Sequence, residues 1–252
     1  MANRAYLLKT SGEVSEELFE AKNTIPLFWF TLLDVALIES TENELISSFG
    51  NEAEDAEWAT VKIAKKRFIA NLFSGKPFIE NYFSSKINVY NDFINYLDKT
   101  FNDNDILELD LLDIANFDGV THLVEEIKKI LKNIKATDSQ LFSFKPDNSL
   151  FSFVGYDGFY RDDFRNYSSD YLAYCLNEEK EQKSQEAQLT KQQSKDKRKE
   201  ILKNSLMFIV GITFIGGSVF GLIKDPSHYL TGIVGILLGI SFAVFGIVKL
   251  KG

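Results

Sequence analysis

Two long runs without a charged side chain near the end of the chain decide how this protein is organised. They are residues 205–223 (SLMFIVGITFIGGSVFGLI) and residues 229–248 (YLTGIVGILLGISFAVFGIV). Runs of 19 and 20 residues would form helices about 28–30 Å long, which matches a hydrocarbon core of about 30 Å. A buried hairpin of a soluble protein would rarely stay uncharged for this length twice in succession. We therefore expect a two-helix transmembrane hairpin over residues 204–252.

Positive charges flank the two runs unevenly. Five lysines and arginines lie within residues 195–203 and two lysines follow the second run, whereas the loop between the runs has one lysine, beside Asp225. Lysine and arginine near membrane spans are retained in the cytoplasm. The pattern predicts a multi-pass protein with both termini in the cytoplasm and the loop outside.

Small residues recur every four positions in each run, which places them on one helix face. The predicted packing positions are Thr213, Gly217, Gly221, Gly235, Gly239 and Ala243. Helices in lipid associate through small residues that let backbones approach closely, so these stripes predict a tight pair and would also permit homo-oligomers. The alternative is that glycine is simply common in membrane helices. Neither run carries an ionisable or amide side chain, so no ion path is expected.

Residues 1–176 are expected to form one acidic, cytoplasmic globular domain. They contain 29 Asp and Glu against 17 Lys and Arg, a net charge of −12. Such a domain repels phosphate backbones, which argues against nucleic acid as a partner. A basic protein partner would complement the charge, although acidic surfaces also serve solubility alone. Residues 177–203 are almost wholly charged or polar and would form a solvated helical linker or a flexible one.

Hydrophobic patterning predicts a helix-rich α+β fold with a β-hairpin for this domain. Residues 150–154 are read as the second strand of that hairpin, after a first strand at 141–145 and a four-residue loop. The other expected elements are a strand at 5–8, helices at 24–37, 54–73, 81–101, 119–134 and 170–176, and a helix or strand at 106–114, with helix favoured. Gly75 and Pro77 are expected to end the helix at 54–73.

The chain carries no recognisable catalytic, nucleotide-binding or metal-binding motif. Its two histidines, His122 and His228, are predicted to lie in different parts of the protein, and its single cysteine, Cys175, is expected to be a buried apolar residue. No metal, cofactor or enzymatic activity is therefore expected. A hydrolase that uses two carboxylates remains open, because such enzymes need no local motif.

A cluster of aromatic and charged residues at 155–165 (GYDGFYRDDFR) is the candidate partner-binding surface. Exposed aromatic rings bordered by acids suit the recognition of a basic, partly apolar protein surface. The predicted residues are Tyr156, Asp157, Phe159, Tyr160, Arg161, Asp162 and Asp163. The alternative is that the rings cover the edge of the core while the acids face water.

The N-terminus resembles a group of uncharacterised bacterial proteins. The shared features are the opening MANRAYL, residues 1–7, and the step Thr24-Ile25-Pro26-Leu27 into an apolar helix. The resemblance covers about 35 residues. Some members occur in settings that suggest toxin-immunity or interbacterial-conflict roles. The resemblance implies a bacterial protein with a cytoplasmic domain, and with the predicted hairpin this gives the bacterial inner membrane as the expected location. The membrane hairpin departs from the soluble form of that group.

Three functions remain as hypotheses. The first is a membrane-anchored cytoplasmic protein-binding module, such as an immunity protein. The second is a membrane effector or assembly component whose cytoplasmic domain controls clustering of the hairpins. The third is a membrane-tethered enzyme. The lack of polar groups other than serine and threonine inside the spans disfavours the second, and the lack of a nucleophile or metal motif disfavours the third.

Overall fold

The computed structural model describes residues 3–48, 59–115, 118–138, 146, 149–157, 163–224, 227 and 229–251. The chain divides into two compact units, Met1–Asn177 and Glu178–Gly252, which we call the N-terminal unit and the C-terminal unit. The N-terminal unit combines a small antiparallel sheet with several helices, and the C-terminal unit is helical.

The sheet of the N-terminal unit has the strand order β3-β4-β1-β2-β5, and every neighbouring pair is antiparallel. The strands are β1 (Arg4–Ser11), β2 (Val14–Lys22), β3 (Val61–Ala64), β4 (Ile106–Asp110) and β5 (Tyr156–Asp157). One row of directly paired, buried side chains crosses four strands: Val61, Leu109, Leu7 and Phe19. Because side chains alternate along a strand, this row fixes which face of the sheet packs on the core.

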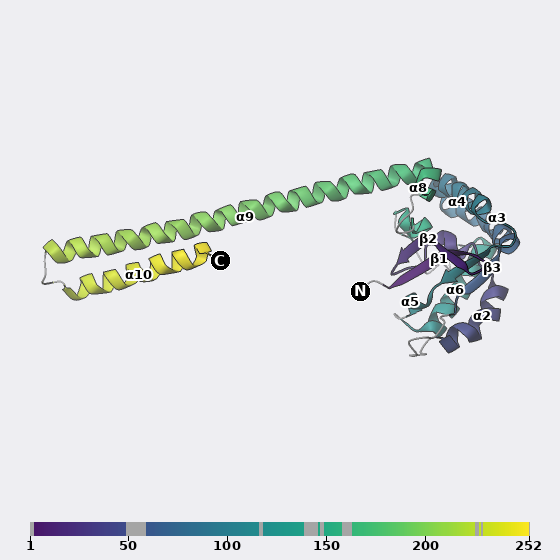
Figure 1. Cartoon of the computed structure of the whole chain (residues 1–252), viewed down its shortest axis with the longest axis horizontal. Coiled ribbons are helices and arrows are strands. Elements are labelled where there is room, and N and C mark those ends of the chain that lie inside the picture. The colour runs from purple at the N-terminus through teal and green to yellow at the C-terminus, as the bar shows by residue number, and fades with distance from the viewer. Residues whose placement is uncertain are drawn as a thin grey trace. The chain divides into compact units, whose positions relative to one another are not determined.

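Helices pack around this sheet (Figure 1). They are α1 (Leu27–Phe30), α2 (Val35–Ser48), α3 (Lys65–Tyr82), the 3₁₀ turn η1 (Ser84–Lys86), α4 (Ile87–Thr100), α5 (Leu112–Ala115), α6 (Val120–Ala136), α7 (Phe151–Val154), α8 (Asp163–Tyr167) and the first turns of α9 (Ser169–Lys224). Phe19 of β2 meets Phe93 and Tyr96 of α4 and Phe164 of α8, with ring centroids 5.4–5.9 Å apart. Aromatic packing therefore joins sheet and helices at the centre of the core.

Hydrogen bonds from buried aromatic side chains tie distant segments together. The Trp29 indole N–H donates to the carbonyl oxygen of Val154 at 2.7 Å, and the Tyr171 hydroxyl donates to that of Gly155 at 2.8 Å. Tyr90 likewise donates to the carbonyl oxygen of Leu72 at 2.7 Å. Each bond satisfies a polar group that would otherwise be buried without a partner.

The β-hairpin lies elsewhere than the sequence indicated. Residues 150–154 do not form a strand, because Phe151–Val154 is the short helix α7; residues 141–145 lie outside the described residues. The hairpin is instead β1–β2, closed by Gly12 and Glu13. Gly12 has a φ of +63°, and Glu13 has no positive φ. A two-residue turn with glycine first matches the type II′ turn that suits strand twist.

Two predictions in the middle of the chain were correct only in part, since residues 65–73 lie in the helix α3 and residues 112–114 lie in the helix α5. The described part of residues 54–73 contains strand β3, whose alternating burial fits its pairing with β4. Ile106–Asp110 is the strand β4 rather than a helix. Helix α3 also continues past Gly75 and Pro77, because Phe78 and Ile79 beyond them are fully buried in the core.

Other predictions agree with the structure. The amphipathic helix at 119–134 corresponds to α6, and the segment 170–176 is helical, with Tyr171 and Cys175 buried. The segment 24–37 is helical only in part, because α1 ends at Phe30 and α2 begins at Val35. The segment 81–101 matches the end of α3, η1 and α4.

Replacing Asp34 with alanine is expected to destabilise the N-terminal unit by about 1–2 kcal/mol, since a helix cap and an ion pair are lost together. Asp34 accepts a hydrogen bond from the Leu37 N–H at 2.9 Å and pairs with Arg67 through both oxygens at 2.7 Å. The hydrogen bond with Arg67, with smaller contributions from Leu37 and Asn71, lowers the pKa of Asp34 from 3.8 to about 2. Urea denaturation followed by tryptophan fluorescence would measure the loss.

The same variant has a defined pH dependence. A carboxyl group with a lowered pKa in the folded state stabilises the fold above its ordinary pKa and loses that contribution as the pH falls through the lowered value. The difference between wild type and Asp34→Ala should therefore be full near neutral pH and shrink between about pH 4 and pH 2. Glu39→Ala, at an exposed position of α2, is the matched control and should show neither effect.

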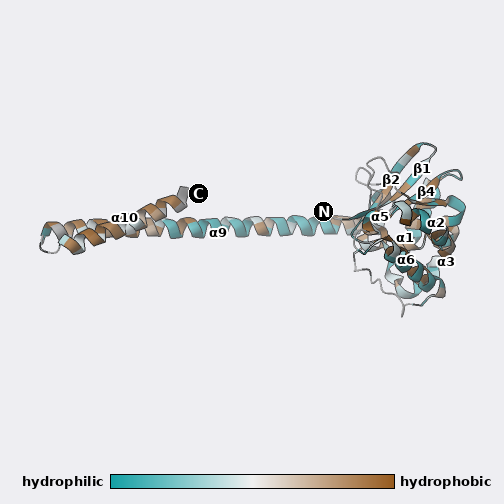
Figure 2. Cartoon of the chain, turned by 90° about the horizontal axis from the view of Figure 1, so that it is seen from below, coloured by the Kyte–Doolittle hydropathy of each residue, from teal (hydrophilic) through white to brown (hydrophobic). Residues whose placement is uncertain are grey.

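The C-terminal unit consists of most of α9 and of α10 (Tyr229–Lys251). Helix α9 is continuous through residues 178–203, so the structure has a helical linker. Figure 2 shows hydrophilic residues in the first part of α9 and hydrophobic residues in its last part and along α10. Among the described residues, one helix, Ser169–Phe220, is long and apolar enough to cross a membrane, and Tyr229–Phe245 is a shorter apolar helix.

A candidate binding pocket at the start of helix α6

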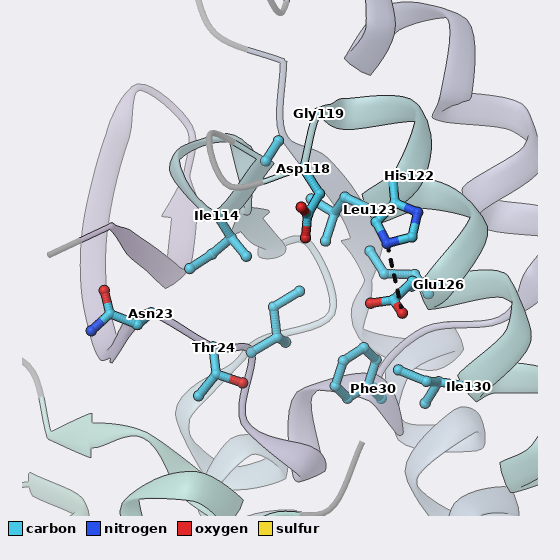
Figure 3. A pocket seen from close by; sticks show the side chains of 13 residues that line it. Asn23, Thr24, Phe30, Ile114, Asp118, Gly119, His122, Leu123, Glu126 and Ile130 are labelled. Atoms are coloured by element: carbon cyan, nitrogen blue, oxygen red, sulfur yellow. Dashed lines mark ion pairs between the residues drawn. The ribbon is translucent and has the colours of Figure 1, made fainter. Parts of the chain in front are cut away.

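A pocket with a volume of about 500 Å³ opens in the N-terminal unit beside the first turns of α6 (Figure 3). It is lined by Asn23, Thr24, Ile25, Phe30, Ile114, Ala115, Asp118, Gly119, His122, Leu123, Glu126, Ile127 and Ile130. These residues come from the chain after β2, from α1, from α5 and from α6. Its size falls within the range of roughly 300–1,000 Å³ that is typical of small-molecule sites.

Two unusual backbone conformations shape the mouth of this pocket. Asn23 directly follows β2 with a φ of +61°, and its side-chain oxygen accepts a hydrogen bond from the Asn3 N–H at 3.1 Å. Asparagine tolerates this left-handed conformation better than most residues. Gly119 precedes α6 with a φ of +90°. The two residues turn the chain so that Thr24 and Asp118 both line the pocket.

Three ionisable side chains occupy the polar side of the pocket. His122 Nε2 lies 3.8 Å from Glu126 Oε1, one helical turn further along α6, and the two side chains are 51% and 48% exposed. Figure 3 shows the Asp118 and Glu126 carboxylates turned toward the enclosed space. All three side chains reach water, so the polar side of the pocket is open to solvent.

The opposite side of the pocket is apolar and belongs to the core. Ile25, Phe30, Ile127 and Ile130 are all buried, with at most 4% of each residue exposed. The i, i+3 spacing of Ile127 and Ile130 places them on one face of α6, toward the core. The pocket therefore has an apolar floor and an acidic rim.

Among the described residues that line the pocket, no nucleophile lies in contact with a base. Thr24 is the only hydroxyl-bearing residue among those described lining residues, and no hydrogen bond between Thr24 and His122 occurs among the described residues. An activated nucleophile needs a base within about 2.6–3.2 Å. Within the described part of the chain, no group of three or more His, Cys, Asp or Glu side chains could hold a metal ion.

Tyr156 and Asp157, two described residues of the predicted partner-binding surface, contact other residues of the N-terminal unit. The Tyr156 ring stacks on Phe151 with centroids 4.2 Å apart, and Lys22 Nζ lies 4.6 Å from its centroid. The Asp157 oxygens accept hydrogen bonds from the Phe164 and Arg165 N–H groups at 3.3 and 2.8 Å, at the start of α8. These contacts are what a core edge and a helix cap require.

The remaining residues of that predicted surface divide into two groups. Asp163 is exposed and opens α8, where a negative charge favours the helix N-terminus. Phe159, Tyr160, Arg161 and Asp162 lie outside the described residues. Of this predicted surface, Tyr156 therefore packs against the ring of Phe151, and Asp157 is hydrogen-bonded to the start of α8.

In the C-terminal unit, α9 and α10 meet through small residues. A side-chain carbon added at Gly211 would lie 2.7 Å from the Gly239 carbonyl oxygen and 2.6 Å from the Ala243 nitrogen. One added at Gly239 would lie 2.7 Å from both the Gly211 carbonyl oxygen and Ile215 Cγ1. Gly235 similarly faces Ser218. The stripe Gly235, Gly239 and Ala243 therefore lies at the helix contact.

The first-run stripe does not lie at this contact. A carbon added at Gly217 would meet no atom within 4 Å, and Thr213 is exposed; the surroundings of Gly221 lie outside those that the structure describes. The contact face of α9 is formed instead by Gly211, Ile215 and Ser218. These contact residues are spaced by four and then three positions, so they form another face of α9 than the one that carries Thr213 and Gly217.

Comparison of the chain with protein-family models, with curated proteins and with solved structures found no match. The function is therefore argued from the residues and geometry described above.

Proposed function

We propose that this protein is a membrane-anchored binding protein: α9 and α10 form a transmembrane hairpin, and the N-terminal unit binds its partner on the cytoplasmic side. The observation that carries the proposal is the apolar surface that the two helices leave exposed after packing on each other. Phe220, Ile223 and Leu230, for example, are 68%, 76% and 64% exposed.

The extent of this surface supports burial in lipid. The exposed apolar residues of the two helices include Leu206, Ile209, Ile212, Phe214, Val219, Leu237, Leu238, Phe242 and Phe245. Exposed patches of this size on a protein in water indicate an interaction with a membrane or another protein. Every side chain within residues 205–223 and 229–248 is uncharged, which a hydrocarbon environment requires.

The charge of the flanking segment supports the orientation. Residues 195–203 of α9 are all exposed, and they carry five lysines and arginines against two acids. Basic residues beside a span favour the cytoplasmic side and the anionic lipid surface there. The N-terminal unit precedes this segment in the chain and would therefore be cytoplasmic.

Binding rather than catalysis is the activity that we propose for the N-terminal unit. Its pocket combines an apolar floor with carboxylates and has no nucleophile in contact with a base among the described residues. The resemblance of residues 1–7 and 24–27 to bacterial proteins of toxin-immunity settings suggests an immunity role in interbacterial conflict as the first biological setting to test.

The topology is tested by labelling cysteines introduced into a Cys175→Ala background. We expect Ser227→Cys, in the loop between α9 and α10, to react with a membrane-impermeant maleimide in intact bacterial spheroplasts. Ser194→Cys, at an exposed position of α9 before the first run, is the matched control and should react only after lysis. Both variants should remain in the membrane fraction after alkaline carbonate extraction.

Two results would contradict the proposal. One is release of the full chain by carbonate, which would mean that lipid does not cover α9 and α10. The other is labelling of Ser227→Cys only after lysis, which would mean that the loop does not reach the outer side. The second result alone would leave anchoring intact and overturn the two-span topology.

A further inference from the structure

We infer that the pocket beside α6 binds a small organic cation, an ammonium or guanidinium group carried on an apolar body. The inference rests on the proposed function only in assigning binding to the N-terminal unit, and it adds the chemical class of the ligand. The argument combines the size of the pocket, its apolar floor and the sign of its charges.

The floor of the pocket suits an apolar ligand body. Phe30, Ile127 and Ile130 belong to the core and also line the pocket. A ligand that covers the accessible part of these side chains removes apolar surface from water on both partners. A volume of about 500 Å³ accepts a body the size of a substituted aromatic ring or a short alkyl chain.

The acidic side chains at the rim of the pocket determine which ligand charge it favours. Asp118 and Glu126 both line it, and no lysine or arginine occurs among its described lining residues. An anionic ligand would meet two like charges. A neutral apolar ligand would remove water from two carboxylates without replacing its hydrogen bonds, which is unfavourable. A cation would instead donate charge-assisted hydrogen bonds to both carboxylates.

Little within the described chain competes for these carboxylates. His122 stays 3.8 Å from Glu126, longer than a hydrogen bond. Asp118 forms no ion pair with another described residue. The lysine nearest in sequence after Glu126 on α6, Lys128, is bound to Glu42 at 2.6 Å. Among the described lining residues, His122 is therefore the side chain that can pair with the acidic rim, and no lysine or arginine neutralises it.

The test uses the full chain in lipid nanodiscs and three probes of matched shape. Isothermal titration with 2-phenylethylamine, 2-phenylethanol and 3-phenylpropionate, each corrected with empty nanodiscs, compares a cationic, a neutral and an anionic head on the same ring. We expect saturable binding of the amine, at least about fivefold weaker binding of the alcohol and no saturable binding of the acid.

Substitutions of the lining residues test whether the amine binds in this pocket. Asp118→Asn and Glu126→Gln should each weaken amine binding about two- to fivefold, and the double variant should weaken it about tenfold. Glu125→Gln, an exposed position of α6 that does not line the pocket, is the matched control and should bind as wild type does. Thr24→Phe should reduce binding by filling the mouth. Unchanged tryptophan fluorescence and denaturation would show that each variant is folded.

Two outcomes would overturn the inference. The first is equal or tighter binding of the alcohol or the acid. The second is amine binding that the double variant leaves unchanged. If carbonate extraction instead showed that the chain is not membrane-anchored, the same titrations in buffer would still decide the pocket's ligand, so the two failures are distinguishable.

Discussion

Replacing Gly155 with alanine is expected to destabilise the N-terminal unit by about 3 kcal/mol or more. Gly155 joins α7 to β5 with φ +94° and ψ −177°, a region that is essentially restricted to glycine and costs other residues about 1–3 kcal/mol. The added methyl group would also lie 2.9 Å from the Glu20 carbonyl oxygen and 3.1 Å from Trp29 Cζ2. Neither neighbour can move freely, because Glu20 lies in β2 and the Trp29 indole is hydrogen-bonded to Val154.

Urea denaturation of the full chain would measure this effect. Both tryptophans of the chain, at positions 29 and 58, belong to the N-terminal unit, so their fluorescence reports its unfolding alone. Gly119→Ala is the matched control, since Gly119 has a similar φ of +90° and ψ of 154° but no atom within 4 Å of an added carbon. It should show the backbone cost without the overlap. Equal losses in the two variants would mean that the contact with Glu20 and Trp29 contributes nothing.

The amphipathic and apolar helices could be predicted because their signals are local. Helix α6 repeats buried residues at helical spacing, from Val124 to Ile127, Leu131 and Ile134. The apolar runs at 205–223 and 229–248 correspond to the helical end of α9 and to α10. In both cases the pattern depends on one helix and needs no knowledge of its neighbours.

The strands were harder to predict, because whether a segment forms a strand depends on the strands with which it pairs. Ile106–Asp110 reads ILELD, which fits a strand or a helix, and only its pairing with β1 and β3 selects the strand. Strand β3 has four residues and lies directly before α3. Its alternation of buried and exposed side chains is therefore hard to recognise beside the longer helical pattern that follows. The β1–β2 hairpin did leave a signal, Gly12-Glu13 between two strand-like segments.

The candidate pocket was hidden from the sequence for a similar reason. His122 and Glu126 are one helical turn apart, so their proximity could have been inferred from α6 alone. Thr24 and Phe30 come from a segment about 100 residues earlier, and only the packed fold brings them to α6. The cluster at 155–165 is easily seen in the sequence. In the structure, however, the Tyr156 ring packs on Phe151, and Asp157 caps the start of α8.

Replacing Gly239 with leucine is expected to disrupt the pairing of α9 and α10, with a loss of about 1–3 kcal/mol. The first carbon of the new side chain would already overlap the Gly211 carbonyl oxygen and Ile215, both at 2.7 Å. Helix pairs in lipid gain little from hydrophobic burial against each other, so close packing supplies much of their association energy. A disulfide between Ser218→Cys and Gly235→Cys, in a Cys175→Ala background, would report the pairing. The Cβ of Ser218 lies 3.1 Å from a carbon added at Gly235. This is slightly closer than the roughly 3.5–4.5 Å between the Cβ atoms of a disulfide, so a small separation of the two helices would let mild oxidation cross-link the reporter pair.

The matched control is the same substitution on the other face of α9. Gly217→Leu adds an identical side chain where no atom lies within 4 Å, so cross-linking of the reporter pair should remain as in the parent. Gly211→Leu should behave like Gly239→Leu, because Gly211 contacts Gly239 and Ala243. Counting free thiols after brief oxidation in membranes distinguishes the three variants. If Gly217→Leu lowered cross-linking as much as Gly239→Leu, the contact face of α9 would be the stripe of Thr213 and Gly217 rather than that of Gly211, Ile215 and Ser218.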